Sequence, residues 1–108
     1  MDEKRMAGSY EIIHALRIGE REVVLGYDPE NKDGNHYMTA FCEENDLFIR
    51  YDEVLASSNY AETVELFANR IAAQAHRVRS KWMRNNNTVK PLNAILLSLF
   101  FLSMIHSP

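Results

Sequence analysis

The sequence lacks the cysteines of a disulfide framework or a multi-cysteine zinc site, because Cys42 is the single cysteine in 108 residues. Its four glycines are scattered, so no glycine-rich loop is present to cradle a phosphate. No apolar run reaches the roughly 20 residues that span a bilayer, and the charged start at residues 1–5 is unlike a signal peptide. We therefore expect a single cytoplasmic domain with no disulfide, and we do not favour association with a membrane.

Acidic residues are absent after Glu65. All 15 of them lie in residues 1–65, which carry a net charge of −9, whereas residues 66–108 carry +6. This division makes the molecule dipolar. Two interpretations stay open: a solvated acidic surface with cations that complement a helix dipole, or a charged pole that docks on a partner.

Alternation of apolar and polar residues predicts four strands joined as an antiparallel meander. They are expected at residues 10–18, 22–27, 36–42 and 47–51. The first strand is expected to bury one whole face, formed by Tyr10, Ile12, His14, Leu16 and Ile18. Residues 52–56 fit either the end of the last strand or a helical turn.

A long amphipathic helix is predicted after the strands. Asn59 and Glu62 have the spacing of a capping box, which satisfies free backbone donors at a helix start. A one-sided apolar stripe follows, formed by Val64, Phe67, Ala68, Ile71, Ala75, Val78 and Trp82. We expect a helix over residues 60–84 that lays this stripe on the sheet and ends at the asparagines 85–87. The fold class is then α+β, with one domain at residues 9–84 and a tail at 85–108.

The tail contains a nearly continuous apolar segment, residues 92–105. At fourteen residues it is shorter than the roughly 20 needed for a membrane span. It fits a short helix packed on the domain, a surface for self-association, a tail anchor, or a reading frame that continues past the domain's natural end.

Residues with catalytic or metal-binding chemistry form no recognisable motif. The candidate ligands His14, His36, Cys42 and His76 include no pair at helical metal-ligand spacing. Cys42 falls in a strand pattern beside two glutamates, which raise rather than lower the pKa of a thiol. We expect a buried, inert cysteine, no metal, no cofactor and no enzymatic activity.

The helix offers a basic face that suits a nucleic-acid backbone. Its cations recur at steps of seven, four and three residues, namely Arg70, Arg77, Lys81 and Arg84. The acidic pI of about 5.8 argues against nonspecific DNA affinity of the whole molecule. Nucleic-acid binding by an accessory protein of conjugation or plasmid replication is therefore the alternative function.

The chain resembles a small domain family of unassigned function from conjugative and other mobile elements of Firmicutes, found alone or within large polyvalent proteins. The resemblance covers about residues 9–80. It rests on the hairpin motif I-G-x-x-E-V-V-L-G from Ile18 and the helix motif Y-x-E-x-x-E-L-F-x-x-R-I from Tyr60. Neither motif contains a catalytic residue, and the tail after Asn85 departs from the pattern.

Such a resemblance implies a role in the spread of the element, and anti-defence inhibitors, including anti-CRISPR proteins, are candidates. The basic channel of a Cas9-type nuclease, with or without its guide RNA, would attract an acidic protein that mimics phosphates. The acidic residues expected to bind it are Asp28, Glu30, Asp33, Glu43, Glu44, Asp46, Asp52 and Glu53.

Overall fold

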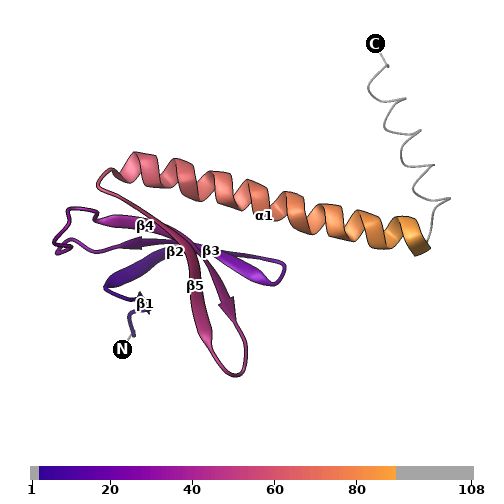
Figure 1. Ribbon diagram of the computed structural model, residues 1–108, viewed down its shortest axis with the longest axis horizontal. Helices are drawn as coiled ribbons and strands as arrows, with labels where there is room; N and C mark the ends of the chain where they lie inside the picture. Colours follow the sequence, from indigo (N-terminus) through magenta and orange to yellow (C-terminus); the bar gives the residue numbers. More distant parts are fainter. Residues whose placement is uncertain (1–2, 90–108) are drawn as a thin grey trace, which may run out of the picture. The chain divides into compact units, whose positions relative to one another are not determined.

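The computed structural model describes residues 3–89 and has an α+β fold, as predicted. Five antiparallel strands form one curled sheet in the order β1-β2-β3-β4-β5, followed by the helix α1 (Figure 1). Their bounds are β1 Met6–Ala7, β2 Tyr10–Ile18, β3 Arg21–Tyr27, β4 Tyr37–Glu44, β5 Ile49–Ser57 and α1 Tyr60–Val89. Residues 1–75 and 76–108 are two separate compact units, and α1 belongs to both.

The prediction of four strands was wrong, because the sheet has a fifth strand, β1. Strand β1 has two residues and pairs with the start of β2 through Met6↔Glu11 and Ala7↔Tyr10. Two residues are too few to give a periodic signal. The ambiguous residues 52–56 belong to β5, and the apolar segment at residues 92–105 lies outside the described residues.

A β-bulge in β2 divides the face that we expected to be uniformly buried. The register with β3 shifts between Ile12 and His14, so Ile13 is an extra residue. An extra residue reverses the alternation of the strand, and His14 and Leu16 therefore lie on the opposite face from Ile12. Leu16 is 46% exposed, which corrects the expectation of burial.

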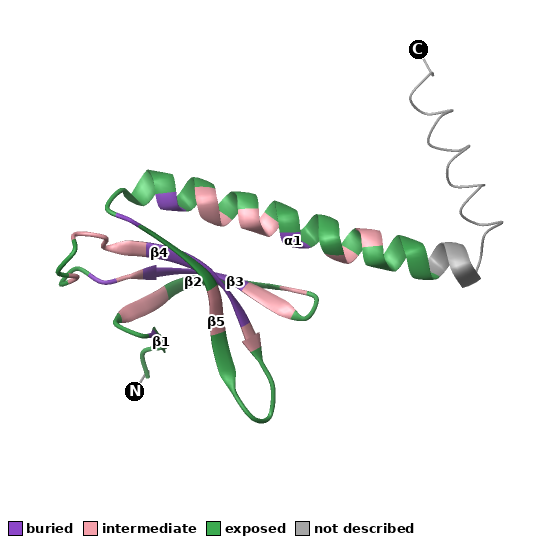
Figure 2. Cartoon of the chain, viewed as in Figure 1, coloured by how far each residue is buried: buried purple, intermediate pink, exposed green. Residues whose placement is uncertain are grey.

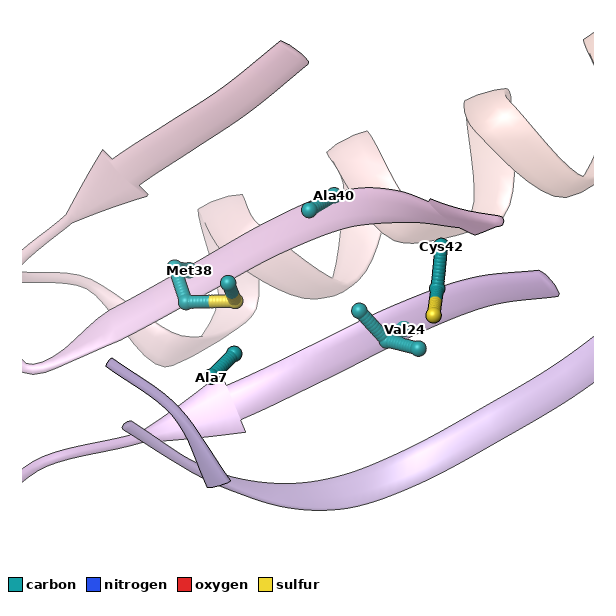
Figure 3. Close-up of a cluster of buried hydrophobic side chains, with 5 residues drawn as sticks. All are labelled: Ala7, Val24, Met38, Ala40 and Cys42. Atoms are coloured by element: carbon teal, nitrogen blue, oxygen red, sulfur yellow. The ribbon is translucent and has the colours of Figure 1, made fainter. Parts of the chain in front are cut away.

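The two faces of the sheet form separate cores. Away from α1, the buried cluster consists of Ala7, Val24, Met38, Ala40 and Cys42 (Figure 3). Burial of Cys42 is confirmed, and the thiol is completely inaccessible. On the α1 side, Val23, Leu25, Thr39 and Phe41 alternate with the members of that cluster.

The helix presents to the sheet a different side from the one that its apolar stripe predicts. Thr63 and Gln74 are buried, whereas the stripe residues Val64, Ala68 and Ala75 are exposed (Figure 2). At 100° per residue, the buried side is rotated by about 80° from the centre of the stripe. Hydrogen bonds from α1 to the sheet, described below, account for this rotation.

The helix also continues through the asparagine triplet, where we expected it to end, and is described as far as Val89. Asparagine in a helix interior is less favourable than alanine by only about 0.7 kcal/mol per residue. Three such residues weaken a helix without terminating it.

The predicted helix start is confirmed. Asn59 Oδ1 accepts a hydrogen bond of 2.8 Å from the Glu62 backbone N–H. The Asn59 backbone N–H in turn donates to Ser57 Oγ at 3.0 Å, which joins the cap to the end of β5.

Replacing Asn59 by alanine should lower the free energy of unfolding by about 1 kcal/mol, because the Glu62 N–H loses its acceptor. Urea denaturation measures the change, and Asn59→Asp, which keeps a capping oxygen, is the matched control. Equal stabilities of Asn59→Ala and the wild type would contradict the capping role.

Candidate protein-binding surface

The hairpin between β4 and β5 exposes three consecutive apolar side chains. Leu47 is 91% exposed, Phe48 42% and Ile49 58%. Asn45 Oδ1 orders this turn by accepting hydrogen bonds from the backbone N–H groups of Leu47, at 2.7 Å, and Phe48, at 3.1 Å. Hydrogen bonds within the turn therefore keep these apolar side chains in solvent. Exposed groups of apolar side chains are a feature of binding surfaces.

Acidic residues surround these apolar side chains. Residues 43–53 contain five acids and one base, a net charge of −4. The base, Arg50, bonds Glu43 at 2.8 Å and Asp52 at 2.7 Å, and these hydrogen bonds and charges raise its pKa. Arg50 therefore offsets part of the charge, while Glu44 and Asp46 are exposed beside the apolar turn.

The other predicted acids lie at the opposite end of β4, in the loop at residues 28–36. Eight strand residues separate the two groups by about 25 Å, so the eight acids do not form one surface. Asp28 is buried and accepts a hydrogen bond from the Glu30 backbone N–H at 3.0 Å, which makes it part of the loop's own structure. Glu30 and Asp33 are exposed.

The eighth predicted acid, Glu53, lies at a second bulge, where the β4–β5 register shifts and its φ is 55°. Its carboxylate is 3.6 Å from Arg21 on the α1 side of the sheet. Glu53 thus contributes to the attachment of the helix as well as to the charge of the hairpin.

Arg21 connects the sheet to α1. Its guanidinium lies 3.9 Å from the centroid of the Phe41 ring and donates to Gln74 Oε1 at 2.8 and 3.1 Å. Gln74 Nε2 completes the contact by donating to the Ile18 carbonyl at 3.0 Å. We call Arg21, Phe41 and Gln74, together with Arg70, the helix clamp.

Arg70 belongs to the helix clamp and not to an exposed basic face. Its guanidinium donates to the Thr39 carbonyl at 3.0 Å and lies 5.0 Å from the Phe41 centroid. Burial lowers its pKa. Of the four cations predicted to bind nucleic acid, Arg77, Lys81 and Arg84 are exposed on α1, and Arg70 is turned toward the sheet.

A second charged cluster lies on the face away from α1. Arg5 donates to both carboxylate oxygens of Glu22 and, at 3.1 Å, to the Tyr51 hydroxyl. The hydrogen bond from Arg5 lowers the pKa of Glu22, and burial raises the pKa of Cys42 beside them. Sequence reasoning missed this cluster because its members are far apart along the chain.

An open depression of about 360 Å³ adjoins this cluster. It is lined by Ala7, Gly8, Ser9, Tyr10, Met38, Tyr51 and Val54. Its two phenols are its only titratable side chains, so this lining provides no acid–base pair for catalysis at neutral pH. Within residues 3–89, no group of three His, Cys, Asp or Glu side chains is placed to hold a metal ion.

Comparisons with protein-family models, with curated proteins and with solved structures give no match. The resemblance to a mobile-element family therefore stays a prediction. Within the described part of the chain, no helix has both the length and the apolar character to cross a membrane.

Replacement of Glu22 by glutamine should lower stability at pH 7 by about 1 kcal/mol, because the charge-assisted bond to Arg5 is weakened. Because the pKa of Glu22 is lowered in the folded state, its ionised carboxylate stabilises the fold at pH values above the ordinary pKa of 4.5. This stabilisation is lost as the pH falls through the lower pKa of the folded state. The difference between wild type and variant should thus disappear in acid.

Urea denaturation across pH measures this difference. The exposed Glu44→Gln variant is the control for loss of one negative charge. A constant stability difference between wild type and Glu22→Gln at every pH would contradict the assignment.

Proposed function

We propose that the chain is a non-enzymatic mobile-element protein that binds and inhibits a host nuclease, a Cas9-type effector alone or with its guide RNA. The observation that carries the proposal is the β4–β5 hairpin, where exposed apolar residues are surrounded by acids. Protein interfaces combine an apolar centre with a polar rim in this way.

The charge of the hairpin suits a partner with a basic surface. A nuclease channel that holds nucleic acid is strongly basic, and a net charge of −4 on residues 43–53 would speed encounter with it. Leu47 and Phe48 would then supply the apolar contact that determines the lifetime of the complex. The acids of the other loop, Glu30 and Asp33, would add long-range attraction without direct contact.

Nucleic-acid binding in conjugation or plasmid replication is the alternative. It loses support because Arg70 is engaged by Thr39 and Phe41. The remaining row, Arg77, Lys81 and Arg84, would still give affinity that falls steeply with salt.

A DNA-cleavage assay tests the proposal, with the protein added to a Cas9-type effector before guide RNA, after guide RNA or after target DNA. Loss of cleavage in any arm is expected, and the arm affected identifies the blocked step. Full cleavage in every arm across several effectors, together with salt-sensitive DNA binding, would replace this proposal with the alternative.

Two charge-reversed variants locate the interface. The double variant Glu44→Lys/Asp46→Lys should weaken inhibition at least about tenfold, because it places cations against a basic partner. The matched control Glu30→Lys/Asp33→Lys makes the same charge change at the other end of β4 and should have a smaller effect. Equal effects of the two variants would contradict docking through the hairpin.

Removal of the apolar contact is a separate test. Leu47→Ser should leave the fold intact, since the side chain is 91% exposed, and should weaken binding by about tenfold. Isothermal titration calorimetry with the inhibited effector measures the affinity. An unchanged affinity would mean that charge alone holds the complex.

A further inference from the structure

Strand β2 has an unpaired outer edge. Strand β1 covers only Tyr10 and Glu11, and the Ile12 N–H bonds the Arg5 carbonyl at 2.8 Å. In the part of the chain that the structure describes, no further strand pairs with this side of β2. Residues 13–18 therefore form a free sheet edge.

The ladder with β3 shows which backbone groups this edge offers. Ile18 pairs with Arg21 across the two-residue turn, and hydrogen-bonded pairs then alternate along an antiparallel strand. Leu16 and His14 consequently bond β3. Ala15 and Arg17 direct their N–H and C=O groups away from the sheet, where another strand could bond them.

The other edge of the sheet carries more charge than this one. Strand β5 has the charged side chains of Arg50, Asp52 and Glu53, which discourage pairing with a further strand. Strand β2 also has a bulge, at Ile13, but it lies at the start of the free edge and leaves residues 14–18 in regular register with β3. Among residues 13–18 of β2, Arg17 is the one Lys, Arg, Asp or Glu. Leu16 and Ile13 are 46% and 39% exposed.

An apolar side of α1 lies next to the same edge. The Phe67 ring is 6.4 Å from the His14 ring on β2, and Arg70 is turned instead toward Thr39 and Phe41 on β4. Val64 and Ile71 share the Phe67 side of the helix by their spacing. Val64 is 36% exposed although it belongs to the helix's apolar stripe.

We propose that this surface, β2 residues 13–18 with the Val64–Phe67–Ile71 side of α1, is a two-fold interface with a second copy of the chain. Antiparallel pairing of the two β2 strands about Ala15 would place His14 opposite Leu16 of the partner subunit. The axis is perpendicular to the sheet, so both helices stay on one face and their apolar sides meet. The same two-fold rotation thus covers both the free edge of β2 and the exposed apolar side of α1.

Charge favours a second copy over the basic partner of the hairpin. Residues 13–18 contain the cation Arg17 and no Asp or Glu, so a basic protein would meet no acidic side chain on this strand. Two copies would meet without like charges opposite each other, since Arg17 would face Ile13 of the partner subunit. The small Ala15 side chain permits close approach at the axis.

Sedimentation equilibrium of the full chain tests the interface, and a concentration-dependent dimer is expected. Leu16→Glu and Val64→Glu should each raise the dimer Kd at least about tenfold, because each would bring two carboxylates into the apolar contact. Leu47→Glu adds the same charge at the exposed hairpin and should leave the Kd unchanged. Circular dichroism confirms that each variant is folded.

Cross-linking checks the register. Ala15→Cys should form a covalent dimer on mild oxidation, whereas Arg17→Cys should not, since two copies of position 17 would lie about 13 Å apart along the strands. A monomer at all concentrations, loss of the dimer in Leu47→Glu alone, or equal cross-linking at positions 15 and 17 would overturn the proposal. These results do not depend on nuclease inhibition.

Discussion

The contact between Arg21 and Gln74 determines how the helix lies on the sheet. Arg21 stacks on Phe41 and donates twice to Gln74, which in turn bonds the Ile18 carbonyl. A half-buried guanidinium needs such acceptors, because burial of an unsatisfied polar group is unfavourable by about 1–3 kcal/mol. The clamp therefore selects the helix side with Thr63 and Gln74 for burial, and the apolar stripe is turned partly outward.

The character of the remaining surfaces follows from this arrangement. With Arg70 occupied beneath the helix, the basic row loses a member, and with Val64 turned outward, an apolar strip adjoins the free edge of β2. The acidic hairpin lies at the β4–β5 side of the sheet. Residues 1–75 thus carry two chemically different surfaces, one acidic and one nearly uncharged.

Local signals in the sequence predicted the parts of the fold that depend on neighbouring residues. Asn59 was recognised as the helix cap, and the strand pattern at residues 36–42 led to the expectation that Cys42 is buried, as it is. The bulge at Ile13 was missed because an inserted residue does not interrupt the apolar pattern. The helix clamp and the Arg5–Glu22 pair were missed because their partners are 53 and 17 residues apart. For the candidate site, composition identified the acids, but only the strand register separated them into two groups.

The side of α1 that faces the sheet decides which residues form each of these surfaces. A NOESY spectrum of the isotope-labelled protein measures this through the aromatic protons of Phe41. We predict cross-peaks from the Phe41 ring to the side chains of Arg21 and Arg70, whose guanidinium carbons lie 3.9 and 5.0 Å from its centroid. Cross-peaks from that ring to the Val64 and Ala68 methyl groups instead would show the apolar stripe on the sheet and would contradict the account.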